Sequence, residues 1–224
     1  MNISLTKIIE SWITDNSKVI DFGCGDGSLL QFLIDNKNVN GYGVEIDHKK
    51  IQQCIEKGLS VIEQDIDEGI QDFVSSNFDF AIMASSIQCL KNPHIALGRM
   101  LDLSKQCVVT LPNLGYWRCR LNLLSGKMPV TPNLPSSWYE TDNLHLCTIK
   151  DFEKLCADEG FVVNKKIFLN GQGKKVALAS LFPNIFSPQF HTQLLYRPHF
   201  GTRILPLGLL GSNREISETT EFLL

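Results

Sequence analysis

The chain has 224 residues, of which 43% are hydrophobic and 20% are charged, with a formal net charge of −3. This length and hydrophobic share predict one domain with a substantial core. The sequence has no long basic run, which argues against nucleic-acid binding. It has no extended apolar core of a signal peptide and no uncharged apolar run of about 18 residues, so we expect no membrane span. The seven cysteines form no C-x-x-C pair, which favours reduced core thiols in a cytoplasmic protein.

The hydrophobic pattern predicts alternating helices and strands. A helix is expected over residues 5–13, before the first strand. The expected strands cover residues 18–22, 40–45, 60–64, 78–83, 107–111, 161–169 and 190–196, the last one half-buried, with 176–182 as its alternative. The expected helices cover residues 27–36, 47–58, 67–74, 93–103, 116–124 and 148–160. Short β-α alternations of this kind require a parallel sheet with right-handed crossovers.

A glycine-rich turn follows the first expected strand. Residues 19–27 read Val-Ile-Asp-Phe-Gly-Cys-Gly-Asp-Gly, and an apolar-periodic run comes directly after them. Glycine permits the positive φ angles of a tight turn and lets a ligand lie on the main chain. Open α/β sheets bind cofactors at this edge. The residues therefore predict a cofactor site at Gly23 and Gly25.

The glycine spacing and the neighbouring acids indicate which cofactor. A dinucleotide fingerprint reads G-x-G-x-x-G, whereas this turn reads G-x-G-x-G. Asp21 and Asp26 would repel a pyrophosphate at close range, which disfavours an NAD-type oxidoreductase. The same carboxylates suit the ammonium and sulfonium charges of S-adenosylmethionine (SAM).

Two further acids are candidates for cofactor binding. Glu45 ends the second strand about 20 residues beyond the turn, where an acid is expected to bind ribose hydroxyls. Asp65 ends the third strand and is expected to accept from the adenine amino group. For each residue alone, a solvated strand end or a helix N-cap is an equal alternative; together they favour the cofactor.

The connection over residues 112–145 is too long for a plain loop, and such segments are usually lids or binding surfaces. His145, at its end, is the best candidate for a catalytic base, although a packed, hydrogen-bonded histidine is the commoner alternative. Tyr139 and Asp142 are weaker candidates. Arg118 and Arg120 are candidates for binding a carboxylate or an acidic partner. No His, Cys or carboxylate cluster has metal-ligand spacing, so no metal site is expected.

Five motifs together resemble the methionine biosynthesis protein MetW family, a branch of the class I SAM-dependent methyltransferases. They are VIDFGCGDG (19–27), GYGVEID (41–47), PNLGYWR (112–118), GKMPVT (126–131) and NLHLCTIKDF (143–152). The first two are shared with class I methyltransferases generally, and the last three are specific to the family. The resemblance covers residues 8–197.

The resemblance implies a Rossmann-like class I methyltransferase fold: a mostly parallel, seven-stranded α/β sheet with helices on both faces. It implies a SAM-binding domain over residues 1–197, with 112–145 as a lid or partner insertion and 198–224 as a poorly ordered tail. By motif position it assigns Asp21, Gly23, Gly25, Glu45 and Asp65 to cofactor binding, and it assigns no catalytic residue. It also implies cooperation with homoserine O-acyltransferase in methionine biosynthesis.

Two functions remain open from the sequence. The first is a regulatory partner that binds SAM and contacts the acyltransferase through residues 112–145. The second is an active methyltransferase on an unidentified small-molecule acceptor, because methyl transfer needs little beyond alignment of the two substrates and exclusion of water.

Overall fold

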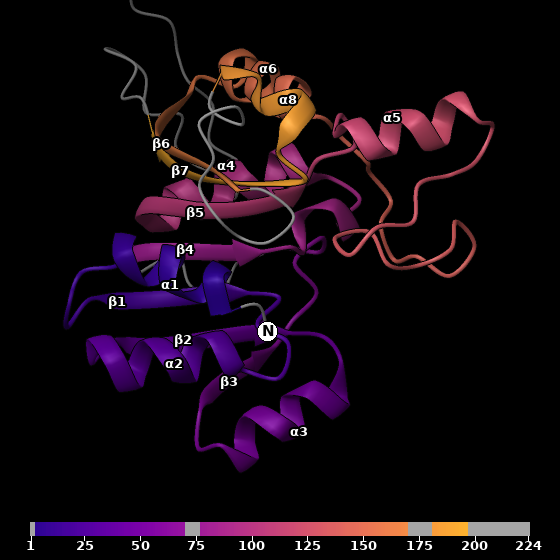
Figure 1. Cartoon of the computed structure of the whole chain (residues 1–224). Coiled ribbons are helices and arrows are strands. Elements are labelled where there is room, and N and C mark those ends of the chain that lie inside the picture. The colour runs from indigo at the N-terminus through magenta and orange to yellow at the C-terminus, as the bar shows by residue number, and fades with distance from the viewer. Residues whose placement is uncertain (1–2, 70–76, 170–180, 197–224) are drawn as a thin grey trace, which may run out of the picture.

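The computed structural model describes residues 3–69, 77–169 and 181–196. Within these ranges the chain forms a seven-stranded sheet in the order β3-β2-β1-β4-β5-β7-β6 (Figure 1). The strands are β1 (Lys18–Phe22), β2 (Asn40–Glu45), β3 (Ser60–Glu63), β4 (Phe78–Ala84), β5 (Ser104–Pro112), β6 (Phe161–Leu169) and β7 (Gln189–Tyr196). The helices are α1 (Ile3–Trp12), α2 (Ser28–Lys37), α3 (His48–Glu56), the 3-10 helix η2 (Ile87–Cys89), α4 (Pro93–Leu103), α5 (Trp117–Leu124), α6 (Ile149–Asp158) and α8 (Pro183–Phe186).

Strands β1 to β5 run parallel, and β7 is antiparallel to both β5 and β6. This confirms the expected mostly parallel sheet. Because the first five strands point the same way, their carboxyl ends meet at one edge, where the glycine turn also lies. In the register Asp21 pairs with Gly43 and Glu45 with Glu63, so the predicted site residues occupy adjacent strands of this edge.

Helices cover both faces of the sheet, as the fold class requires. Side chains of α1 and α2 pack on one face, and those of α4 and α6 pack on the other. Alternate residues of β4 divide between the two layers: Phe80 and Ile82 face α1 and α2, whereas Ala81 and Met83 face the opposite core. Burial on both faces explains why β4 is almost entirely apolar.

Strand β7 was predicted to be half-buried, and this is wrong. It lies between β5 and β6, so both of its faces are covered. Phe190 packs edge-on against Phe152 of α6 with ring centroids 5.3 Å apart, while His191 and Gln193 on the opposite face are 0% and 1% exposed. A strand buried on both faces can still alternate polar and apolar residues when polar groups gather on one face.

Several expectations fall partly or wholly outside the described residues. Residues 70–74 of the helix expected over 67–74 lie outside the described residues, as do residues 176–180 of the alternative strand expected over 176–182. The tail over 198–224 lies wholly outside them. Residues 66–68 form a turn, and Phe182 is the N-cap of α8. Within the part of the chain that the structure describes, no helix is long and apolar enough to cross a membrane.

The helix termini follow the local signals in the sequence. The Asp47 carboxylate accepts from the backbone N–H groups of Lys49 and Lys50, which caps α3. Thr148 and Asp151 form a reciprocal capping box at the start of α6. Gly58 and Gly160 follow α3 and α6 with φ near +74°, the left-handed conformation that ends helices.

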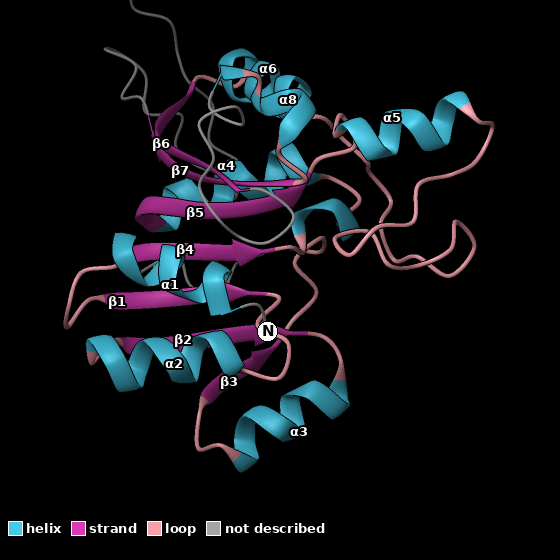
Figure 2. Cartoon of the chain, viewed as in Figure 1, coloured by secondary structure: helices cyan, strands magenta, loops and turns pink. Residues whose placement is uncertain are grey.

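The segment over residues 112–145 leaves the carboxyl end of β5 and extends away from the sheet (Figure 2). It contains α5, in which Cys119 is buried, and an irregular stretch that returns to α6. Its exposed apolar side chains include Leu124, Trp138 and Tyr139, at 83%, 72% and 69% exposure. Such a group of exposed apolar side chains is typical of an interaction surface.

The capping box predicts a measurable loss of stability. Thr148→Ala removes the hydroxyl that accepts from the Asp151 N–H, so the free energy of unfolding should fall by about 1 kcal/mol. Urea denaturation measures this change. Thr14→Ala, at an exposed position after α1, is the control and should change stability by much less. Equal effects of the two substitutions would contradict the role of the box.

Candidate functional site

The turn between β1 and α2 is built from three glycines in the left-handed region. Gly23, Gly25 and Gly27 have φ angles of 71°, 60° and 74°. Their surroundings differ, however. A Cβ on Gly23 or Gly27 would clash with Ser86 or Leu59, whereas a Cβ on Gly25 would meet no atom within 4 Å. The backbone of Gly25 therefore borders open space, where a ligand can approach the main chain.

Glu45 fixes this turn from the neighbouring strand. Its Oε2 accepts from the Gly25 N–H at 2.8 Å, and its Oε1 accepts from the backbone N–H groups of Ile46 and Asp47 at 2.9 and 3.1 Å. The side chain is only 7% exposed. Three N–H donors satisfy the oxygens of this buried side chain, which lies beside the glycine turn. The structure thus brings Glu45 and Gly25 together.

Asp21 lies at the same edge in a different environment. It is 2% exposed, and its Oδ1 has no hydrogen-bond partner among the described residues. Burial, reinforced by the nearby negative charge of Glu45, raises the pKa of Asp21 to about 7. Near neutral pH the Asp21 carboxyl is therefore poised between its protonated and ionised forms. An orphaned oxygen of this kind would be satisfied by a donor from a bound group.

Asp26 is not free to bind a cationic ligand in the way that the sequence suggested. Lys57 Nζ lies 3.0 Å from Asp26 Oδ2, and Ser28 donates to the same carboxylate. These hydrogen bonds, with Ser28 as the largest contribution, lower the pKa of Asp26 to about 2. The carboxylate thus stabilises the start of α2. Sequence reasoning missed Lys57 because 31 residues separate the pair.

Asp65 follows β3 at the same edge of the sheet. The N–H of the preceding residue, Gln64, donates to the backbone oxygen of Glu45 at 3.1 Å. One Asp65 oxygen accepts from the Asp67 N–H at 2.9 Å, and the side chain is partly exposed. Asp65 therefore closes a local turn, and no hydrogen bond within the described residues joins its side chain to the glycine turn.

Residues after β4 form the other side of the turn. Ser86 Oγ donates to the Phe22 backbone oxygen at 3.0 Å, directly before Gly23. Ser85, beside it, is exposed and has a φ of +63°, which is uncommon for a residue other than glycine. Such strain often marks functional positions. No local signal reveals a positive φ at a serine.

Cys24 and Cys54 pack beneath the turn with their sulfur atoms 4.0 Å apart. Cys54 also donates to the Gly25 backbone oxygen at 3.2 Å. Burial raises the pKa of both thiols, so they remain neutral. This agrees with the expectation of reduced core thiols.

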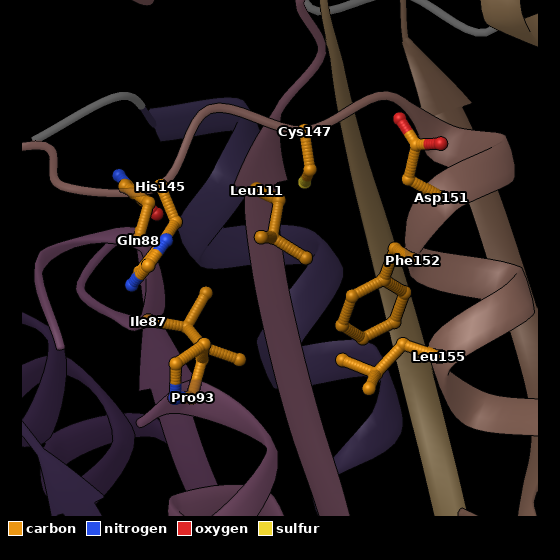
Figure 3. Close-up of a pocket in the computed structure, with 9 residues that line it drawn as sticks. All are labelled: Ile87, Gln88, Pro93, Leu111, His145, Cys147, Asp151, Phe152 and Leu155. Atoms are coloured by element: carbon orange, nitrogen blue, oxygen red, sulfur yellow. The ribbon is translucent and has the colours of Figure 1, made fainter. Parts of the chain in front are cut away.

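His145 lies apart from the glycine turn, beside a separate cavity (Figure 3). The ring Nε2 of His145 is 3.2 Å from the Lys91 backbone oxygen, and the backbone N–H of His145 donates to the Gln88 backbone oxygen at 3.0 Å. Among the described residues no hydrogen bond joins His145 to the glycine turn. His145 is hydrogen-bonded but exposed, so it fits the hydrogen-bonded part of that alternative and is not a packed histidine. Within the same residues no group of His, Cys, Asp and Glu could hold a metal ion.

Comparison with known proteins adds to this geometry. Residues 4–194 match the family model described as "Methionine biosynthesis protein MetW". The chain belongs to the MetW family. A relative from Rhodopirellula baltica, the "Bifunctional methionine biosynthesis protein MetXA/MetW", is 27% identical over 187 residues. That match covers 79% of this chain and 30% of the relative, so the chain spans less than a third of the bifunctional protein.

Solved structures show the same fold at low sequence identity. A putative methyltransferase bound to the Trm112 activator of Haloferax volcanii is 15% identical, with a TM-score of 0.62 over 88% of this chain and 91% of that one. A SAM-dependent methyltransferase from Archaeoglobus fulgidus is 14% identical, with a TM-score of 0.60 over 85% and 94%. The MetW-family chain therefore has the class I methyltransferase fold.

The buried carboxyl of Asp21 predicts a pH-dependent stability. Its pKa of about 7 in the folded chain exceeds the ordinary aspartate value of 3.8, so stability is lost as the pH rises from about 4 to about 7. Asn does not titrate, so the stability of Asp21→Asn relative to the wild type should increase between pH 5 and pH 8. Urea denaturation at both pH values measures this difference.

Asp35→Asn, on the exposed face of α2, is the control and should show no such change. The raised pKa would be contradicted if the difference in unfolding free energy between Asp21→Asn and the wild type were the same at pH 5 and pH 8.

Proposed function

We propose that this chain binds SAM at the glycine turn and acts with homoserine O-acyltransferase as a SAM-sensing subunit in methionine biosynthesis. The observation that carries the proposal is the hydrogen bond from Gly25 to Glu45, which fixes a buried carboxylate beside open backbone. Membership of the MetW family supplies the pathway. The cofactor and the partner are inferences from the site and from the relatives.

The residues at the turn fit a cationic nucleoside amino acid. The backbone of Gly25 offers space for close approach, and Asp21 has an oxygen without a donor. Together, Asp21 and Glu45 favour positive charge and disfavour a pyrophosphate. We assign the ribose hydroxyls to Glu45, the adenine amino group to Asp65 and the amino-acid end to Asp21, Gly23 and Gly25. SAM itself would supply a methyl group on a good leaving group.

The partner surface is assigned to residues 112–145. In the Rhodopirellula baltica relative the MetXA and MetW names belong to one bifunctional protein, which supports an association between the two activities. The segment extends away from the sheet (Figure 2). Its Leu121, Leu124 and Trp138 side chains are exposed. Apolar and aromatic side chains of this type form the anchors of protein interfaces. Arg118 and Arg120 add positive charge to the same segment.

An active methyltransferase is the second candidate, and Ser85 is the observation that favours it. The strained Ser85 lies at the carboxyl end of β4, next to the serine that contacts the glycine turn. An acceptor placed there would lie beside the bound cofactor. Incubation with methyl-labelled SAM and cell extract tests this function. Tight SAM binding without label transfer to any fraction would exclude it.

The cofactor assignment predicts the effect of Glu45→Gln. Loss of the charge weakens hydrogen bonds from ribose hydroxyls by about 1.5 kcal/mol or more, which corresponds to a roughly tenfold weaker affinity. Calorimetric titration with SAM and NADH measures it, and NADH should not bind. Glu63→Gln, at the paired position on β3, is the matched control. Equal SAM affinity in wild type and Glu45→Gln would exclude this site.

The partner assignment predicts the effect of charge on α5. Leu124→Asp places a carboxylate on the exposed apolar surface, so co-purification with the acyltransferase should be lost. Ile55 on α3 is 63% exposed and also lies outside the core. Ile55→Asp is therefore the control and should retain the partner.

Acyltransferase rates with and without this chain and SAM complete the test. The proposal expects the chain to change the rate and SAM to modulate that change, because a coupled site alters the affinity for the partner reciprocally. Unchanged rates in every combination would rule out the regulatory function.

A further inference from the structure

A further pocket lies where α5, α6 and α8 meet. Its volume is about 390 Å³, and none of the residues assigned to the cofactor lines it. In Figure 1, α8 lies against α6, and α5 begins close to both. Arg120 lines the pocket from α5, Ile149 and Lys150 line it from α6, and Phe182 and Ile185 line it from α8 and its start. The pocket therefore borders the helix that belongs to the proposed partner surface.

A buried asparagine connects the elements that form this pocket. Asn113 is 1% exposed, and its Nδ2 donates to the backbone oxygens of Asn184 and Ser187 at 3.2 and 2.7 Å. Its Oδ1 accepts from the Gly115 N–H, just before α5, at 2.9 Å. The side-chain oxygen of Asn184 in turn accepts from the Ile149 N–H at 3.1 Å, at the start of α6. The walls are thus fixed before a partner binds, which lowers the entropic cost of binding.

Two cations without a carboxylate partner line the pocket. Arg120 Nε donates to the Gly115 backbone oxygen at 2.6 Å, which orients the guanidinium and leaves its two terminal nitrogens without a partner among the described residues. Lys150 Nζ likewise has no ion pair or hydrogen bond there. Glu153, whose carboxylate also lines the pocket, is paired with Lys166. The positive charge is therefore unbalanced, and a guanidinium held in this way suits a carboxylate.

Exposed apolar side chains adjoin the two cations. Leu181 and Phe182 line the pocket but remain 72% and 56% exposed. Leu124 lies four residues after Arg120, and therefore on the same face of α5. A small ligand confined to the pocket would leave much of this apolar surface in contact with water, whereas a protein surface would cover all of it. The exposure thus favours a protein as the occupant.

We propose that this pocket receives a segment of the acyltransferase in which an acidic side chain neighbours an apolar one. The docking site rests on the proposed association with the acyltransferase and adds the chemistry of the contact. The carboxylate accepts from Arg120 and Lys150, and the apolar side chain packs on Phe182. A basic segment would be repelled by the two cations, and a wholly apolar segment would bury them without a counter-charge, which is costly.

Affinity measurements between the acyltransferase and variants of the full chain test this contact. Arg120→Glu and Lys150→Glu each reverse a charge in the pocket, so each should weaken binding about tenfold or more. Lys150 is exposed, so its variant should fold even if Arg120→Glu does not. Lys154→Glu, one turn further along α6 and outside the pocket, is the matched control and should retain the wild-type affinity. Because salt screens exposed charges, added NaCl should weaken binding more in the wild type than in Lys150→Glu.

The Leu124→Asp variant separates this docking site from the partner assignment itself. Weaker binding of Lys150→Glu with wild-type binding of Lys154→Glu supports the docking site. Wild-type affinity in Lys150→Glu together with a loss in Leu124→Asp overturns the docking site and leaves the partner surface in place. No binding of the acyltransferase to the wild type overturns both.

Two other occupants are tested alongside. Calorimetric titration with phenylacetate probes a small apolar carboxylate, and light scattering probes a second copy of the chain. Saturable phenylacetate binding that Lys150→Glu abolishes without a change in affinity for the acyltransferase overturns the docking site. A dimer of the chain that Lys150→Glu dissociates, again with unchanged affinity for the acyltransferase, also overturns it.

Discussion

The contact between Gly25 and Glu45 is the constraint on which the site depends. A turn with three left-handed glycines has little conformational preference of its own, so another element must hold it. Glu45 binds the Gly25 N–H with one oxygen and the start of the β2–α3 connection with the other. One buried side chain thereby fixes two loops at the carboxyl edge of the sheet.

Two neighbouring acids at this edge have different surroundings. Glu45 has three backbone donors, whereas Asp21 is buried with one oxygen unpaired. Burial and the Glu45 charge raise the pKa of Asp21 to about 7. A cation beside Asp21 favours its ionised form, so binding of a cationic ligand near neutral pH is coupled to release of a proton.

Local signals predicted most of the strands and helices, and contacts between distant residues account for the errors. The glycine turn, the Asp47 cap and the Thr148 capping box each depend on a few adjacent residues. The burial of β7 depends on its insertion between β5 and β6, and the pairing of Asp26 with Lys57 depends on where α3 packs. The residues proposed for the cofactor were chosen by their positions at strand ends. The cavity beside His145 is lined by η2, α4, β5, α6 and the segment around His145, and it has no sequence signature.

The anchoring of the 112–145 segment explains how it can expose apolar side chains and remain attached to the fold. Asn113, which is 1% exposed, donates to the backbone oxygens of Ser187 and Asn184 and accepts from the Gly115 N–H. The far end is held by the Gln88 backbone oxygen. Both anchors lie at the carboxyl edge of the sheet, so the proposed partner surface starts and finishes at the same edge as the glycine turn. This arrangement offers a physical route from a bound ligand to a surface that lies away from it, because a ligand that shifts either anchor also shifts the segment between them.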